Sequence, residues 1–362
     1  MRRALLNPFL ALIAGSVLLT ACSSESDTEA TSTSENSPKN TSPAVVNIYS
    51  QRKEALLKPV LEAFTQDTGI EVNLVTGNAD ALVQRLKSEG ENSPADVLIT
   101  TDAGRLYRAK REGVLQAIES ETLHKRIPAH LRDRDNQWYG LSKRARVIFY
   151  NKDAVDPSEI SDYQDLANPE WLGRICIRSS SNIYNQSLLA SIIAHRGHEQ
   201  AKAWAEGVVK NLARTPQGGD RDQLKAAAVG VCDIAVANTY YYGGWLGSDD
   251  EMDKQYAQKL AVLYPNQDDG ETGAHVNVSG AGVTRHAPHR DAAIQLLEYL
   301  TGHSAQQFYA NDNYEYPVVE GTPVSDLVKS WGYPFKADDL SLNKLGENNA
   351  EAVKIFDQVG WK

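Results

Sequence analysis

Residues 45–101 read VVNIYSQRKEALLKPVLEAFTQDTGIEVNLVTGNADALVQRLKSEGENSPADVLITT. Three short apolar segments in this stretch are predicted strands: 45–49, 70–75 and 97–99. Between them, apolar residues recur at helical spacing around Leu57–Phe64 and Leu82–Leu86. Gly69 and Gly90 follow these two segments, as is typical of helix ends. A strand–helix–strand–helix order predicts an α/β lobe with a mostly parallel sheet.

The same alternation continues toward the C-terminus. Further strands are predicted at 147–149, 174–178, 234–236 and 276–278, with helices between and after them. Residues 45–362 exceed the usual size of a single core, so we expect two lobes. The strand at 276–278 is expected to return to the first lobe, so that crossing strands join the lobes and a ligand binds in the cleft between them.

The first residues have the pattern of an export signal. Arg2 and Arg3 precede an apolar run from Ala4 to Leu19, and small residues lead to Cys22. We interpret residues 1–21 as a lipoprotein signal peptide and Cys22 as the lipidated residue; an ordinary signal peptide with a chance cysteine is the alternative. Residues 22–44 are rich in Ser, Thr, Glu, Asn and Pro, which predicts a disordered tether. The expected location is the periplasm or the outer face of the cytoplasmic membrane, with membrane contact through the lipid anchor only.

Charge and cysteine content narrow the function classes. The chain has 37 basic and 47 acidic residues, a formal net charge of −10, and no basic cluster, which argues against a nucleic-acid partner. With Cys22 carrying lipid, Cys176 and Cys232 remain. In an oxidising compartment two cysteines suggest one disulfide, but two buried free thiols are also compatible with the sequence. We expect a monomer.

Tyrosine is the informative residue type. Tyr240, Tyr241 and Tyr242 directly follow a predicted strand, and Tyr184 lies just beyond the strand 174–178. Ligands in open α/β sheets bind at the carboxyl ends of strands. Phenolate is a hard anionic oxygen donor that suits a hard trivalent cation. The alternative is that these tyrosines are partly buried packing residues whose hydroxyls find a neighbour.

Six stretches resemble the periplasmic ferric-binding proteins of bacterial ABC transporters, in particular the cyanobacterial-type group. They are GLSKRARVIFYNK, GRICIRSSSNIYNQSLLAS, GGDRDQLKAAAVG, DIAVANTYYYG, HVNVSGAGV and NDNYEYPV. The resemblance implies the type II periplasmic-binding fold, with an N-lobe of 45–142 plus about 269–317 and a C-lobe of 143–268 plus about 318–362. It also implies Tyr184, Tyr240 and Tyr241 as iron ligands, and Tyr242 as a wall of the pocket.

One segment departs from the family pattern. Many relatives have Y-S-x-R-H-Y in the first strand–helix turn, whereas this chain has Lys53 and Glu54 at the last two positions. Glu54 is either a weak contributor to the site or a solvated acid in a first helical turn. Three phenolates leave an octahedral ion incomplete, so carbonate, another synergistic anion or water would finish the shell. Arg52 and Arg144 are the anion-binding candidates, with Arg146 as a further one; a solvated approach to the hinge is the alternative reading of 143–146.

The resulting hypothesis is a lipoprotein that captures Fe(III) and delivers it to an inner-membrane ABC permease and its ATPase. Another small solute, such as an oxyanion, a carboxylate or a polyamine, is the alternative. No nucleophile–base pair, phosphate loop or zinc spacing can be assembled, so an enzyme is not expected. His195 and His198 flank Gly197 in a predicted helix-to-helix turn and are expected at the surface.

Overall fold

The computed structural model describes residues 44–362. The predicted signal peptide, Cys22 and nearly all of the predicted tether lie outside the described residues. Within residues 44–362, no helix combines the length and the apolar character needed to cross a membrane.

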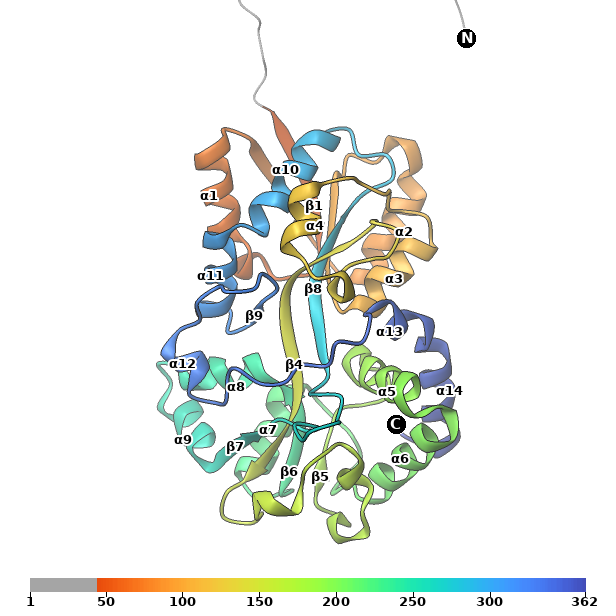
Figure 1. The fold of residues 1–362 in the computed structure, drawn as a ribbon, viewed down its shortest axis with the longest axis vertical. Coiled ribbons are helices and arrows are strands. Elements are labelled where there is room, and N and C mark those ends of the chain that lie inside the picture. Colours follow the sequence, from red (N-terminus) through yellow and green to blue (C-terminus); the bar gives the residue numbers. More distant parts are fainter. Residues whose placement is uncertain (1–43) are drawn as a thin grey trace, which may run out of the picture. The chain divides into compact units, whose positions relative to one another are not determined.

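Nine strands form one mixed sheet (Figure 1). They are β1 (Val45–Ser50), β2 (Glu71–Thr76), β3 (Val97–Thr101), β4 (Tyr139–Asn151), β5 (Ile175–Cys176), β6 (Ile234–Asn238), β7 (Leu260–Leu263), β8 (Val276–Val283) and β9 (Tyr316–Pro317). The order is β2-β1-β3-β8-β4-β6-β5, and β7 and β9 also pair with β4. The β1–β2, β1–β3 and β5–β6 pairs are parallel, and the pairs made by β4 and β8 are antiparallel.

Fourteen α-helices connect and cover these strands in the described part of the chain. They are α1 (Lys58–Thr68), α2 (Ala79–Glu89), α3 (Ala103–Arg111), α4 (Glu121–Arg126), α5 (Ile183–Arg196), α6 (His198–Lys210), α7 (Asp220–Ala228), α8 (Thr239–Leu246), α9 (Glu251–Lys259), α10 (Arg290–Leu300), α11 (His303–Asn311), α12 (Asp326–Lys329), α13 (Asn343–Glu347) and α14 (Asn349–Val359). In Figure 1, α1–α4 and α10 gather around one end of the long strands β4 and β8, and α5–α9 around the other end.

The first elements form for local reasons that the sequence shows. In α1, Val60, Leu61 and Phe64 lie on one buried face, and Gly69 ends the helix in the left-handed conformation with φ of 73°. The side chain of Asn78 caps α2 by accepting hydrogen bonds from the backbone of the first helical turn. The parallel β2–β1–β3 unit therefore agrees with the prediction from 45–101.

β4 is the strand that connects the two halves of the sheet. Residues from Tyr139 to Ala145 pair with β8, whereas residues from Arg146 to Tyr150 pair with β6. β4 thus changes its pairing partner from β8 to β6 between Ala145 and Arg146. The prediction of crossing strands fits this pairing, while the exact lobe limits given above remain a prediction.

Several elements differ in extent from their prediction. The strand expected over 174–178 is only the two-residue β5, because the chain leaves the sheet after Cys176. The helix expected from about Asn185 begins at Ile183, since Asn182 provides its N-cap. Arg144 and Arg146 are each 2% exposed, so the solvated reading of 143–146 is wrong for both.

Candidate metal centre

Two helix starts carry the candidate ligands. Tyr184 lies in the first turn of α5, which follows β5, and its backbone N–H donates to the Asn182 side chain at 3.1 Å. Tyr240 and Tyr241 lie in the first turn of α8, which begins directly after β6. Because β5 and β6 are parallel neighbours, both helices start at the same edge of the sheet.

The structure brings these three tyrosines together. The hydroxyls of Tyr184 and Tyr240 are 3.4 Å apart, and the ring centroids of Tyr240 and Tyr241 are 4.3 Å apart. The side-chain amide of Asn238 donates to the Tyr240 hydroxyl at 3.4 Å. All three tyrosines are half-buried. A single ion could therefore meet at least two phenol oxygens that come from separate segments of the chain.

The surroundings keep the phenols of Tyr240 and Tyr241 protonated in the absence of a cation. Burial raises the pKa of Tyr240 well above its ordinary value, the neighbouring Tyr184 and Tyr241 add to this effect, and the positive charge of Arg144 opposes it. Burial and the proximity of Tyr184 raise the pKa of Tyr241 to about 12. A ligand that binds these oxygens as phenolates must supply enough positive charge to displace their protons.

Two weaker candidates are placed elsewhere. Tyr242 is buried, its ring packs beside Phe149 with centroids 5.5 Å apart, and its hydroxyl donates to the Ala257 carbonyl at 3.2 Å. Its ring and hydroxyl are therefore engaged in packing contacts, and its place as a wall of the pocket remains a prediction. Glu54 is exposed in a short 3-10 turn, and within residues 44–362 it makes neither a side-chain hydrogen bond nor an ion pair. The structure therefore favours the solvated reading of Glu54.

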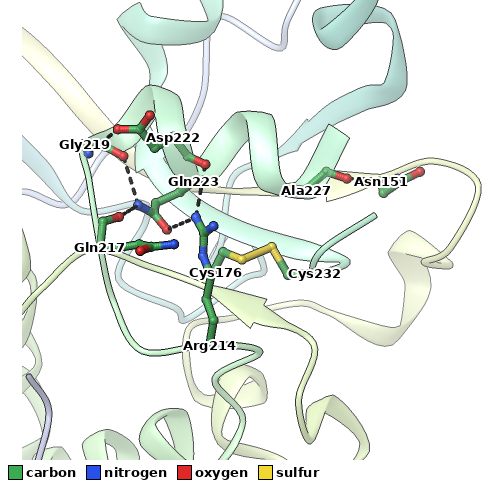
Figure 2. Close-up of a disulfide and its surroundings, with 9 residues drawn as sticks. All are labelled: Asn151, Cys176, Arg214, Gln217, Gly219, Asp222, Gln223, Ala227 and Cys232. Carbon is green, nitrogen blue, oxygen red and sulfur yellow. Dashed lines mark hydrogen bonds between the residues drawn. A yellow bond between two sulfur atoms is a disulfide. The ribbon is translucent and has the colours of Figure 1, made fainter. Parts of the chain in front are cut away.

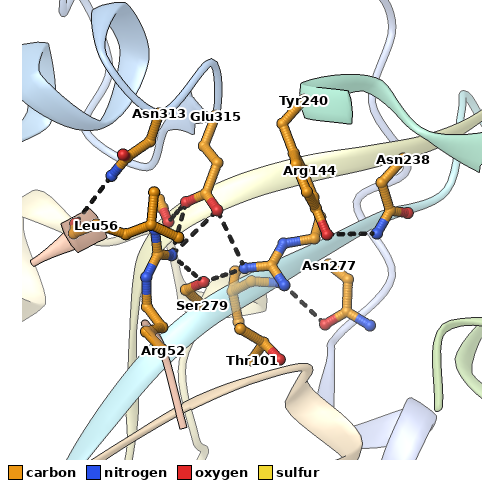
Figure 3. Close-up of polar contacts among 12 residues, drawn as sticks. Arg52, Leu56, Thr101, Arg144, Asn238, Tyr240, Asn277, Ser279, Asn313 and Glu315 are labelled. Atoms are coloured by element: carbon orange, nitrogen blue, oxygen red, sulfur yellow. Dashed lines mark hydrogen bonds and ion pairs between the residues drawn. The ribbon is translucent and has the colours of Figure 1, made fainter. Parts of the chain in front are cut away.

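Arg52 and Arg144 meet at a buried carboxylate that the sequence analysis did not single out (Figure 3). Arg52 Nη1 donates to Glu315 Oε2 at 2.8 Å, and Arg144 Nη2 lies 3.7 Å from Glu315 Oε1. Both guanidinium groups also donate to the Ser279 hydroxyl, and Ser142 donates to Glu315. Burial alone would raise the pKa of Glu315, but the charges of Arg52 and Arg144 outweigh it and hold that pKa below its usual range.

This arginine pair adjoins the tyrosines. The guanidinium carbon of Arg144 lies 5.8 Å from the centre of the Tyr240 ring. Arg52 keeps two buried nitrogens, Nε and Nη2, without a hydrogen-bond partner in the described structure, and Arg144 keeps its Nε. Both candidates therefore retain donors, although one carboxylate already neutralises part of their charge. Glu315 was missed because its pairing with residues 52 and 144 exists only in three dimensions.

Cys176 and Cys232 form a disulfide with Cα atoms 5.9 Å apart (Figure 2). It joins the end of β5 to the residues before β6, and each cysteine precedes a candidate ligand by eight positions. Gln223 of α7 is nearby in Figure 2 and donates to the Gly219 carbonyl at 3.0 Å. The disulfide therefore ties together the two segments that lead to Tyr184 and Tyr240.

Clusters of His, Cys, Asp and Glu side chains are the other usual metal sites to consider in residues 44–362. Within the described residues, no group of three or more His, Cys, Asp or Glu side chains is arranged to hold a metal ion. His195 lies at the surface, as expected, and its imidazole pairs with Asp338 at 2.9 Å. The candidate metal site described here therefore rests on the tyrosines.

A sheet whose halves share β4 and β8, with polar side chains gathered at strand ends, is typical of α/β proteins that bind a ligand at the edge of a sheet. The chain belongs to the bacterial extracellular solute-binding proteins, because the sequence pattern of that family matches residues 92–338. It is accordingly a solute-binding protein and not an enzyme.

Known relatives agree with this assignment. The chain is 46% identical over 351 residues to "Iron uptake protein A1" of Synechocystis, which covers 97% of this chain and 95% of that protein. A solved structure from Trichodesmium, described as in complex with iron and citrate ligands, is 48% identical with a TM-score of 0.85. The match covers 88% of this chain and all of the Trichodesmium chain.

A ferric binding protein from Campylobacter jejuni is 42% identical with a TM-score of 0.82, over 88% of this chain and all of the other. These neighbours confirm the predicted type II periplasmic-binding fold and the family resemblance seen in the sequence.

Proposed function

We propose that this chain captures ferric iron through the phenolates of Tyr184, Tyr240 and Tyr241. The observation that carries the proposal is the 3.4 Å approach of the Tyr184 and Tyr240 hydroxyls from two neighbouring strand ends, with the Tyr241 ring against Tyr240. Relatives named for iron uptake, and a structural neighbour described with iron and citrate, support the same ligand.

The electrostatics of the centre favour a small, highly charged cation. A neutral phenol is a weak ligand, and the raised pKa values of Tyr240 and Tyr241 mean that a weakly charged ion would not displace their protons. Three phenolates offset the charge of one trivalent ion. Iron uptake at neutral pH should therefore release protons from the tyrosines.

Arg52 and Arg144 are proposed to hold an anion that completes the coordination shell. Both are buried, both keep unpartnered donors, and a guanidinium fork matches a planar oxyanion. Carbonate is one candidate, and a carboxylate such as citrate is another. If the anion binds here, iron loading with bicarbonate and with citrate should give absorption bands at different wavelengths, and Arg52→Met should remove that difference.

Delivery to an inner-membrane ABC permease and its ATPase, and anchoring through a lipid on Cys22, belong to the same proposal. The family assignment supports delivery to a transporter, and the sequence before Cys22 supports the anchor. Growth in bacteria with a labelled fatty acid checks the anchor, because the wild-type protein should take up the label and a Cys22→Ala variant should not. Equal labelling of the two proteins, or an unlabelled wild-type protein, would contradict lipidation at this residue.

The test of iron capture is an absorption titration of the purified protein with ferric citrate. We expect a visible phenolate-to-iron charge-transfer band that saturates at about one iron per chain. A variant with Tyr184, Tyr240 and Tyr241 all changed to Phe should show no band. Tyr242→Phe, in the same helix, is the matched control and should keep the band, because its hydroxyl is bonded to a backbone carbonyl.

The contrary result is equally clear. If the wild-type protein shows no band at saturating ferric citrate, or if the triple variant keeps it, iron is not bound by these phenolates. An oxyanion, a carboxylate or a polyamine would then be the next solute to test.

A further inference from the structure

Arg146 is a buried arginine at the position where β4 changes its pairing partner from β8 to β6. Its guanidinium donates through Nη2 to Asn185 Oδ1 at 2.6 Å and to the Val236 carbonyl at 3.3 Å. Through Nη1 it donates to Asp220 Oδ2 at 3.2 Å and to Asn238 Oδ1 at 3.4 Å. Both terminal nitrogens are thus occupied by protein groups and only Nε is left without a partner, so the guanidinium fork that would hold a planar oxyanion is already in use.

The partners of Arg146 are the neighbours of the tyrosines. Asn185 directly follows Tyr184, and its side-chain amide also donates to the Arg178 carbonyl at 2.7 Å, which fixes the turn before α5. Asn238 lies two residues before Tyr240, and its amide reaches the Tyr240 hydroxyl at 3.4 Å. One guanidinium is therefore bonded to both segments that carry phenol oxygens.

Asp220 completes this connection. Its carboxylate is fully buried, pairs with Arg146, and accepts a hydrogen bond from the backbone N–H of Asn238 at 3.2 Å. Arg178 lies 3.9 Å away on the other oxygen, and its guanidinium carbon is 5.9 Å from the centre of the Tyr184 ring. Removing either partner of a buried ion pair of this kind is strongly destabilising, because the remaining charge loses its closest compensating group.

We propose that Arg146 is a positioning residue that sets the separation of the Tyr184 and Tyr240 hydroxyls by holding Asn185 and Asn238. This inference rests on the proposed function, since it assigns a role toward the same phenol oxygens. Arg146 does not touch the ion in this proposal; it fixes the two turns from which the ligands project. Groups that orient metal ligands in this way typically change metal affinity by about 10-fold to 100-fold when they are removed.

Two substitutions test whether Arg146 positions the tyrosines, one at Arg146 itself and one at its partner Asn185. Arg146→Lys keeps a positive charge beside Asp220 but cannot bond Asn185 and Asn238 together. Asn185→Ala keeps the buried ion pair and removes the Arg146 contact together with the hydrogen bonds from Asn185 to the carbonyls of Arg178 and Ser179. For both variants we expect a shifted or weakened phenolate-to-iron band and an iron affinity lowered by about 10-fold to 100-fold, with about one iron per chain still bound at saturation.

Arg174→Lys is the matched control. Arg174 belongs to the same half of the molecule and pairs with Asp233 at 2.5 Å, but its side chain bonds neither the turn before Tyr184 nor residues 238–241. We expect this variant to keep the wild-type band and affinity. Circular dichroism and the melting temperature of the iron-free proteins show whether each variant is folded. If Arg146→Lys fails to fold, the band and iron affinity of Asn185→Ala alone test the proposal.

The proposal is overturned if folded Asn185→Ala, and Arg146→Lys where it folds, show the band position, intensity and iron affinity of the wild-type protein. Failure of the underlying function is a separate result, because the wild-type protein itself would then show no band. A changed band in the variants with an unchanged band in Arg174→Lys supports the positioning role and excludes a general loss of stability.

Discussion

Glu315 is the residue on which the buried charge beside the tyrosines depends. It is 5% exposed and faces two guanidinium groups, Arg52 at 2.8 Å and Arg144 at 3.7 Å. Its carboxylate also accepts a hydrogen bond from Ser142. Without this carboxylate, two buried positive charges would lie together with no compensating group among these contacts.

We therefore expect Glu315→Gln to lower the free energy of unfolding by about 3–5 kcal/mol, the usual effect of removing one partner from a buried ion pair. Urea unfolding of the iron-free protein measures this change. Glu251→Gln is the control, because Glu251 pairs with Lys254 at the surface and its side chain is 77% exposed. Equal stability of Glu315→Gln and the wild-type protein would show that the arginines do not need this carboxylate.

His275 should make the stability of the folded protein depend on pH. Burial, the charge of Arg146 and the proximity of His195 lower the pKa of His275 to about 3. The facing groups are Arg146 on β4 and His195 on α5, which itself pairs with Asp338. In the unfolded chain a histidine has a pKa of about 6.5.

The folded pKa is thus below the unfolded one, so the unfolded chain binds more protons between pH 6.5 and pH 3. The contribution of His275 to stability is complete above about pH 6.5 and is lost as the pH falls, at up to about 1.4 kcal/mol per pH unit. Urea unfolding at several pH values should give a flatter dependence for His275→Gln than for the wild-type protein. Parallel curves would mean that His275 is not held neutral.

Among the elements, β5 and β6 matter most for the site, because each leads directly into a ligand-bearing helix. The disulfide between Cys176 and Cys232 closes a loop with a sequence separation of 56 residues. We expect the double variant Cys176→Ala/Cys232→Ala to lose about 2–4 kcal/mol of unfolding free energy, because the unfolded chain gains freedom. Urea unfolding with and without a reductant checks this.

The reductant is also the control for that prediction. It should weaken the wild-type protein toward the stability of the double variant and leave the double variant unchanged. A reductant that lowers the stability of both proteins by the same amount would show that the effect does not come from this disulfide.

The strand ends of these elements were predictable from sequence, and their side-chain partners were not. Apolar segments and the tyrosines after them indicated that Tyr184 and Tyr240 follow strands, and the structure places both at one edge of the sheet. Whether Tyr242 packs or faces the site depends on helical rotation in α8, which begins only at Thr239 and continues through two glycines. Buried links such as Arg146–Asp220 join residues 74 positions apart, and no local pattern encodes them.

For the whole molecule, the placement of candidate ligands on different halves of the sheet is the important feature. Tyr184, Tyr240 and Tyr241 belong to the half with β5 and β6, whereas Arg52 directly follows β1 in the other half. β4 and β8 run between the halves and pair with each other (Figure 1). Asp102, at the start of α3, accepts a hydrogen bond from Ser187 of α5 at 2.7 Å, so the two halves also touch beside the ligand helix.

An ion held by the tyrosines, with an anion held by Arg52, would connect the two halves directly, and we expect it to favour their closest approach. Small-angle X-ray scattering of the purified protein should therefore give a smaller radius of gyration with ferric citrate than without it. The variant with Tyr184, Tyr240 and Tyr241 changed to Phe should show no such decrease, because no ion would then link the tyrosine half to the anion at Arg52. If the wild-type protein saturates with iron and its radius of gyration stays the same, the halves do not move on binding, and β4 and β8 act as rigid supports and not as a hinge.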